Sequence, residues 1–293
     1  MRKSKEKSAL EKHKKIAELL LAVAIFWALA FDKVGFTGPG LVESVFTINA
    51  NALPGDLGEP FSSFQKGTAK SLEGRTVIIS YFVNTPSSSW TAKKIKKELP
   101  VMDTAFQYII RQAKNYDVEC EFIYDWEEAD NRDLIHRRTI MKDPEETKDF
   151  EYYLDDMLAI WKDGAFSYDD YLKKYDADNV FMMVFFDGDG RDYAISYDGE
   201  DSPQESMISY STSGASVMAH EVLHLFGAHD FYEGAEYKEE TTSYLENEYK
   251  NDIMLKVNPP GKITKTIGAV TAYHLGWTDD CPDLKDHPEL KRQ

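Results

Sequence analysis

The sequence predicts an α+β domain, because strand-like and helix-like apolar patterns alternate along most of the chain. Residues 76–83 form a β-branched and aromatic run and residues 179–187 contain a continuous apolar run, so both are predicted as buried strands. Between them, residues 91–116 carry apolar side chains at helical spacing, with Pro100 predicted either to kink the helix or to mark the start of its main part. The chain has 293 residues and a hydrophobic content of 42%, enough for one sizeable domain or two small ones.

Shorter elements follow from the same signals. Three further strands are predicted, over residues 120–126, 191–197 and 205–210. A helix is predicted to begin at Asp143-Pro144-Glu145-Glu146, because Asp suits the N-cap position and Pro the first helical position. Residues 263–275 are predicted as a closing helix that Gly276 stops.

The segment Asp187-Gly188-Asp189-Gly190 lies between two of the predicted strands. Asp-Gly is a turn dipeptide, so the segment favours a tight hairpin. A loop that binds a structural Ca²⁺ ion is the alternative, but the ligand spacing and the terminal Glu of an EF-hand loop are missing. The sequence therefore gives structural calcium no support.

The N-terminal segment predicts export. Basic residues crowd positions 1–15, an apolar run follows over positions 16–31, and Ala28-Leu29-Ala30 gives the small-x-small pattern of a signal peptidase site. Residues 1–30 fit a cleaved signal peptide or an uncleaved signal anchor, so we expect a protein that is secreted or anchored to the outer face of the cytoplasmic membrane. Residues 31–74, rich in Gly, Pro, Ser and Asn, are predicted as a linker or leader, and residues 75–293 as the folded domain.

Charge and cysteine content narrow the range of partners. A formal net charge of −17 argues against nucleic acid, because phosphate binding needs clustered Lys and Arg. Cys120 and Cys281 are the two cysteines, and whether they form a disulfide stays open. Without CxxC spacing they do not form a zinc site. We expect a monomer that contacts a membrane only through its N-terminal segment.

The strongest chemical signal begins at His220. His220 and His224 are four residues apart, so on a helix they lie on one face and can bind one tetrahedral Zn²⁺ ion. Glu221 lies one step round the helix, beside the metal without being a ligand. That position suits a general base for a zinc-bound water.

The residues that follow extend this signal. Gly227 falls where the helix must stop, because glycine tolerates the left-handed conformation that turns the chain back. Asp230 can then approach the metal and complete a three-ligand site with a fourth position open for water. His229 is the alternative third ligand, or else a residue that supports the ligands.

The whole motif resembles that of the metzincin clan of zinc metallopeptidases, HExxHxxGxx followed by His or Asp. The matching residues are His220, Glu221, His224, Gly227 and Asp230, and an Asp as third ligand is similar to snapalysin-type secreted peptidases. Asn251-Asp252-Ile253-Met254 is similar to the Met-turn of the clan, which would place Met254 beneath the metal. The resemblance covers roughly residues 76–280 and implies a twisted mixed sheet with an antiparallel edge strand, an active-site helix, a Met-turn and a closing C-terminal helix. Residues 127–177 would then be a helical insertion.

The resemblance implies a zinc-dependent endopeptidase with one catalytic Zn²⁺ ion, which hydrolyses peptide bonds by metal-activated water with Glu221 as general base. Its partner would be a peptide or protein substrate, added as a strand along the edge around residues 193–197. Position 256 holds Lys where some metzincins have a Tyr that steadies the oxyanion. That role stays unassigned, with Tyr232 and Tyr249 as unsupported alternatives.

Two other functions remain open. One is a different zinc hydrolase in which a distant Glu supplies the third ligand, although Gly227, Asp230 and Met254 in register argue against it. The other is a non-catalytic, zinc-stabilised extracellular binding module. Glu221 argues against that function, because a purely structural zinc site has no use for a base there.

Overall fold

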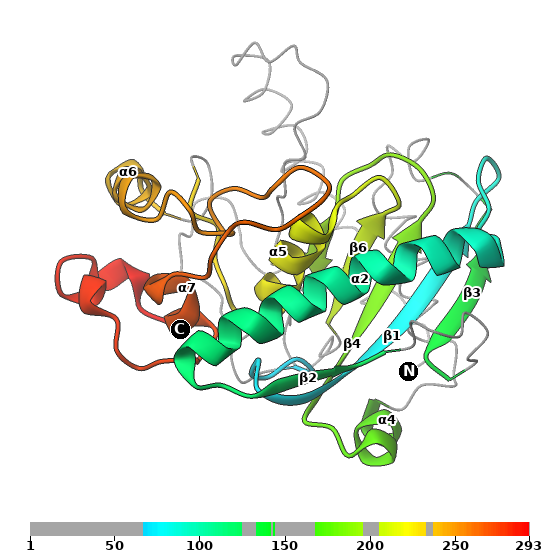
Figure 1. Ribbon diagram of the computed structural model, residues 1–293, viewed down its shortest axis with the longest axis horizontal. Coiled ribbons are helices and arrows are strands. Elements are labelled where there is room, and N and C mark those ends of the chain that lie inside the picture. The colour runs from blue at the N-terminus through cyan, green and yellow to red at the C-terminus, as the bar shows by residue number, and fades with distance from the viewer. Residues whose placement is uncertain are drawn as a thin grey trace, which may run out of the picture. The chain divides into compact units, whose positions relative to one another are not determined.

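The computed structural model describes residues 67–124, 133–141, 143, 168–195, 205–232 and 237–292, and across these ranges the chain builds one six-stranded sheet (Figure 1). Its strands are β1 (Gly74–Asn84), β2 (Cys120–Ile123), β3 (Ile135–Thr139), β4 (Asn179–Phe186), β5 (Tyr193–Ile195) and β6 (Ser206–Tyr210). The strand order is β2-β1-β4-β6-β5, and β3 also pairs with β1. The predicted α+β class is confirmed.

The sheet is mostly parallel. β1 pairs in parallel with β4 along one side. On its other side, β1 pairs in parallel with β2 over Gly74–Val77 and with β3 over Ser80–Asn84. β5 runs antiparallel to β6 at the far edge of the described sheet. β3 was not predicted, since its sequence Ile-His-Arg-Arg-Thr lacks a clear apolar alternation and falls within the stretch expected to be a helical insertion.

The predicted hairpin at Asp187-Gly188-Asp189-Gly190 is wrong. β6 lies between β4 and β5, so the segment joins two strands that are not neighbours. Asp187 accepts a hydrogen bond from Ser211 and forms an ion pair with Lys94 Nζ at 2.6 Å. A neighbouring ammonium thus already balances the charge of this carboxylate.

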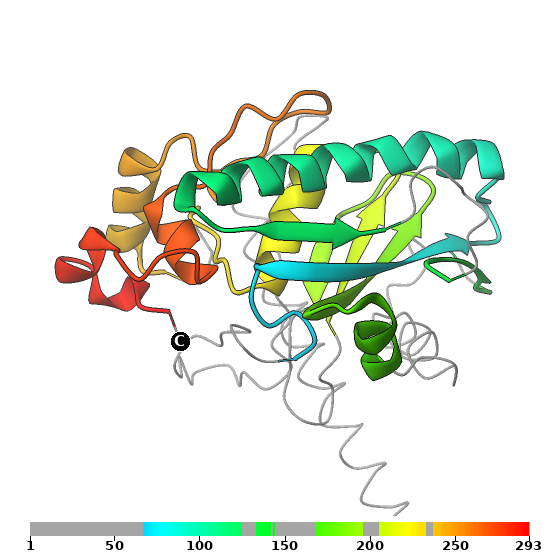
Figure 2. The same cartoon turned by 60° about the horizontal axis from the view of Figure 1, so that its bottom comes forward.

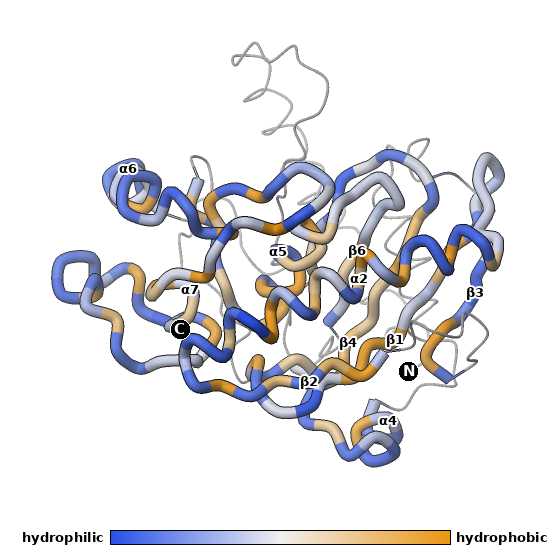
Figure 3. Tube along the Cα trace, viewed as in Figure 1, coloured by the Kyte–Doolittle hydropathy of each residue, from blue (hydrophilic) through white to orange (hydrophobic). Residues whose placement is uncertain are grey.

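The helices in the described ranges are α2 (Ala92–Ala113), α4 (Tyr168–Tyr175), α5 (Ala215–Leu225), α6 (Glu239–Glu248) and α7 (Ala269–His274). Short 3-10 turns cover Lys114–Tyr116, Pro282–Lys285 and Pro288–Leu290. α2 and α5 cover one face of the sheet and α4 lies on the other (Figure 2). Because side chains alternate along a strand, β1 sends Ile78 into the first core and Val77 and Ile79 into the second. Figure 3 shows this apolar centre in the strands and the alternating character of α2.

Two predicted helices have different limits from those expected. Thr91 accepts the Lys94 N–H and caps α2, so the helix begins well before Pro100 and continues through it. α7 ends before Gly276 (φ 79°) as predicted, but it begins only at Ala269. The residues just before it are not helical, and Thr266 among them forms an isolated parallel bridge with Asp252.

The folded unit starts earlier than position 75. Ala69 and Leu72 are fully buried, and the Glu205 carboxylate accepts the backbone N–H groups of Thr68 and Ala69. Part of the expected linker thus belongs to the core. The predicted export segment (1–30) and the body of the helix predicted from Asp143 lie outside the described residues.

Two further observations concern the cysteines and the length of the helices. Cys120 and Cys281 are free thiols, so the disulfide that the sequence left open is not formed in the structure. Within the described ranges, no helix has the length and apolar character needed to cross a bilayer.

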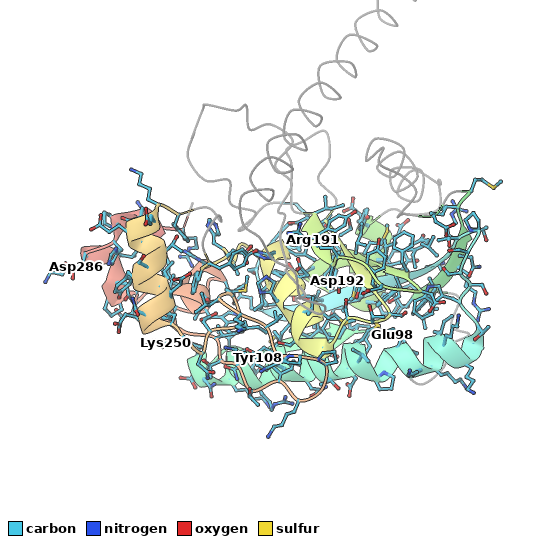
Figure 4. All side chains as sticks on the ribbon, turned by 90° about the horizontal axis from the view of Figure 1, so that it is seen from above. Glu98, Tyr108, Arg191, Asp192, Lys250 and Asp286 are labelled. Atoms are coloured by element: carbon cyan, nitrogen blue, oxygen red, sulfur yellow. The ribbon has the colours of Figure 1, made fainter. Side chains whose placement is uncertain are left out.

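One carboxyl group on α2 makes stability depend on pH. Glu98, labelled on α2 in Figure 4, is 5% exposed, and one of its oxygens has no hydrogen-bond partner among the described residues. Burial, and secondly the nearby Asp192 carboxylate, raise the pKa of Glu98 to about 8. The folded protein therefore binds this proton more tightly than the unfolded chain, whose Glu pKa is near the ordinary value.

The free energy of unfolding should fall as pH rises from the ordinary Glu pKa to about 8, by at most about 1.4 kcal/mol per pH unit for this one group. Glu98→Gln removes the titration, so its stability relative to wild type should grow with pH through that window and then level off. Urea unfolding at a series of pH values measures the difference, with the exposed Glu246→Gln as control. A difference that does not change with pH contradicts the prediction.

Candidate metal centre

The helix that carries the motif is buried along its whole length. Every residue of α5, Ala215–Leu225, is buried, which agrees with the apolar residues that separate its histidines. The helix ends where the sequence predicted: Gly227 has φ 95°, and the Ala228 N–H turns back to the Leu223 carbonyl at 3.1 Å. This turn sends the next residues back beneath the helix.

Three potential ligand atoms meet at one point below α5. His220 Nε2 and His224 Nε2 are 3.0 Å apart, and Asp230 Oδ1 lies 3.1 Å from the first and 3.3 Å from the second. The three residues are buried, and they form a His-His-Asp group that can hold a metal ion. The structure thus brings together the three residues that the sequence predicted as ligands.

Backbone carbonyls fix the orientation of both imidazoles. His220 Nδ1 lies 3.0 Å from the Ile253 carbonyl oxygen, and His224 Nδ1 lies 2.7 Å from that of Ala228. Since a carbonyl oxygen only accepts hydrogen bonds, each Nδ1 carries a proton, and the Nε2 atom of each ring faces Asp230 Oδ1. A cation at this point satisfies all three groups.

The electrostatics of the group agree with a cation site. Burial acts to lower the pKa of His224, but the Asp230 carboxylate outweighs it and raises that pKa to about 10. Burial acts to raise the pKa of Asp230, yet the two imidazoles hold it well below its ordinary value. Without a metal ion, a proton on His224 therefore supplies the positive charge that the carboxylate requires.

The two candidates for the third position have different neighbours. The His229 ring stacks on Tyr237, its centroid lies 4.7 Å from that of His274, and the residue is not part of the His-His-Asp group. Asp230 is held by Tyr232, whose hydroxyl donates to Oδ2 at 2.6 Å and leaves Oδ1 toward the histidines. Tyr249, the other tyrosine considered from sequence, donates its hydroxyl to Asp283 instead.

Met254 is fully buried in the turn that follows α6. The Met254 carbonyl accepts the Phe231 N–H at 3.1 Å, which ties this turn to the residue after Asp230. One residue earlier, the Ile253 carbonyl binds His220. The turn thus contacts both His220 and the residue that follows Asp230. The sequence pointed to Met254 but not to the contacts of the Ile253 and Met254 carbonyls. Every residue type has a backbone carbonyl, so residue identity does not reveal which carbonyl forms such a contact.

Glu221 lies next to His220 and is fully buried, and neither of its oxygens has a hydrogen-bond partner in the described part of the chain. Burial raises its pKa, while His220, His224 and the more distant Arg191 act to lower it. Figure 4 shows Arg191 and Asp192 beside α5, in the segment that leads into β5. An unpaired buried carboxylate is costly for stability, so its retention favours a chemical role.

No family model matches the chain, and no curated protein matches it either. The fold and the site define an α+β protein with a buried His-His-Asp group that can hold a metal ion. A more specific function depends on the chemistry of that group.

Asp230→Ala should lower metal affinity by at least about 100-fold, which exceeds the loss typical for residues that only support a ligand. His229→Ala should keep one equivalent of metal and bind it about 10–100-fold more weakly, the loss typical of a residue that supports a ligand. Competition with a chromophoric chelator, together with the metal content by mass spectrometry, measures both. Undiminished affinity in Asp230→Ala would mean that another residue is the third ligand.

Tyr232→Phe should weaken metal binding by about 10–100-fold, because Asp230 Oδ2 loses its donor and the carboxylate is free to rotate. Tyr249→Phe is the matched control, since that hydroxyl serves Asp283. Equal affinities for the two variants would exclude an orienting role for Tyr232.

Proposed function

We propose that this protein is a zinc-dependent endopeptidase of the metzincin type. The observation that carries the proposal is the convergence of His220, His224 and Asp230, with Glu221 beside them and without a hydrogen-bond partner among the described residues. Two imidazoles and one carboxylate form a donor set that suits Zn²⁺, and three protein ligands leave the fourth tetrahedral position for water or substrate. The turn that contains Met254, whose Ile253 carbonyl orients His220, and the antiparallel edge strand β5 also support this proposal.

In the proposed peptide hydrolysis, the metal ion and Glu221 have different roles. A bound zinc ion supplies Lewis acidity, which polarises a carbonyl and makes a water molecule acidic near neutral pH. Glu221 accepts a proton from the attacking water and delivers it to the amine of the leaving peptide. The low polarity that raises the pKa of Glu221 also makes this carboxylate a stronger base.

Substrate binding is proposed at β5. One side of β5 pairs with β6, and no described strand pairs with the other. An extended peptide can add to such an edge through main-chain hydrogen bonds, which give affinity with little sequence preference.

We further propose that residues 1–30 direct export, as a cleaved signal peptide or as a membrane anchor. The net charge of −17 suits a soluble domain that does not bind nucleic acid. A monomer is sufficient for the proposed site, because all its residues come from one chain.

Glu221→Gln should reduce peptide cleavage by about 10²–10⁴-fold, the typical contribution of a general base, while keeping one equivalent of zinc. The assay is mass spectrometry of a mixed peptide library treated with zinc-loaded protein. Glu246→Gln, which removes an exposed carboxylate on α6, is the control and should cut as wild type does.

Two outcomes would redirect the assignment. A wild type that binds zinc but cuts no peptide would favour the non-catalytic binding module. A Glu221→Gln variant that cuts as fast as wild type would remove Glu221 from the mechanism while leaving the metal site intact.

A further inference from the structure

One short helix touches both ends of the candidate metal centre. α7 lies after the turn that contains Met254, and its six residues are outside the motif that defines the ligands. Its first turn is bonded to the residue before Ile253, and its last residue contacts His229. These two ends support different ligands.

The first contact is made by Asp252, a buried carboxylate. Its Oδ1 accepts the Met254 N–H at 2.8 Å, and its Oδ2 accepts the Gly268 N–H at 2.7 Å and the Thr271 hydroxyl at 3.0 Å. The bonds on either side of Ile253 therefore fix its carbonyl, the group that orients His220. A displaced Ile253 carbonyl would let the His220 ring rotate away from Asp230.

The second contact is made by His274 at the end of α7. The Tyr237 hydroxyl lies 3.3 Å from His229 Nδ1 and 3.5 Å from His274 Nε2, and the two imidazole centroids are 4.7 Å apart. Since His229 directly precedes Asp230, the position of its ring determines where the backbone of the third ligand lies. Both histidines are buried.

The C-terminal residues of the described chain hold α7 in place. The carbonyl of Leu290, itself fully buried, accepts a hydrogen bond from His274 Nε2 at 2.9 Å. Arg292 donates to the Tyr273 carbonyl at 2.9 Å, and its guanidinium carbon lies 4.7 Å from the centre of the Tyr273 ring. α7 is thus fixed at its C-terminal end from two sides.

We propose that α7 is a two-ended brace of the metal centre, in which Asp252 and His274 are positioning residues. Asp252 acts on His220 through the Ile253 carbonyl, and His274 acts on Asp230 through His229. The brace keeps the first and third ligands at the spacing that one metal ion requires, although they come from a helix and from a loop. This inference rests on the proposed metal site.

The test uses the full chain loaded with Co²⁺, whose visible absorption reports the ligand geometry. Asp252→Asn and His274→Leu should each weaken Co²⁺ binding by about 10–100-fold and change the absorption bands. The matched controls are Glu205→Gln, a buried carboxylate that accepts backbone N–H groups elsewhere, and His287→Leu, a histidine of the C-terminal segment that stacks on Tyr244. Both controls should bind as wild type does, with its spectrum.

A double variant tests whether one helix couples the two ends. If α7 acts as a unit, releasing one end already loosens the other, so the loss of affinity in Asp252→Asn/His274→Leu should be smaller than the product of the single losses. Losses that multiply would mean two independent supports and would overturn the brace. Circular dichroism first establishes that each variant is folded at the assay temperature.

The remaining outcomes are also decisive. Variants that lose thermal stability but bind Co²⁺ with wild-type affinity and spectrum would show a purely structural role and overturn the inference. If Asp252→Asn does not fold, Thr271→Val removes only one of the three bonds to Asp252 and should give a smaller loss in the same direction. A wild type that binds no metal would refute the proposed function itself, which distinguishes that failure from a failure of the brace alone.

Discussion

Three electron pairs directed at one buried point are the constraint on which the rest of the structure depends. The Nε2 atoms of His220 and His224 and the Oδ1 atom of Asp230 lie within 3.3 Å of one another, and all three residues are buried. Such atoms repel unless a positive charge lies among them, so the arrangement is stable only with a cation or a bound proton. The surrounding elements must therefore hold the three groups together against their own repulsion.

Backbone oxygens provide most of that restraint. The Ile253 carbonyl fixes one imidazole and the Ala228 carbonyl fixes the other, and each comes from a segment that is itself anchored. The turn around Gly227 places Ala228, and the bonds of Asp252 place Ile253. Rigid second contacts of this kind keep the imidazoles in one tautomer and one orientation, which a ligand set needs before the metal arrives.

Residues whose role requires a particular side chain could be predicted from the sequence. Contacts made by backbone groups could not. The spacing of His220 and His224 follows from helix geometry, and Gly227 from the left-handed conformation that a side chain disfavours, so both were predictable. β3 was missed because it falls within the stretch expected to be a helical insertion and has no alternating pattern. The hairpin prediction was wrong because a turn dipeptide specifies only a local bend. It does not specify which strands pair, and here β6, further along the chain, lies between β4 and β5.

The same distinction explains the residues around the site. Asp252 was visible only as part of a turn, since nothing in the sequence indicates that it bonds to Gly268 and Thr271 across the next segment. Tyr232 was named only as an unsupported alternative for the oxyanion donor, and no local pattern indicated that its hydroxyl donates to Asp230. Contacts between segments that are distant in sequence depend on tertiary packing, which local patterns do not encode.

The choice of Asp at the third position has a physical consequence for the whole site. In the proposed zinc site, the double positive charge of the ion would be offset by one negative charge from Asp230 and one from the adjacent Glu221. A third imidazole would leave the buried group with a net positive charge, which is costly in a low-dielectric interior. A carboxylate ligand thus suits a centre in which all four side chains are withdrawn from water, and it lets Glu221 remain buried without a hydrogen-bonding partner among the described residues. In the proposed site, the negative charges of Glu221 and Asp230 would therefore together neutralise the metal ion.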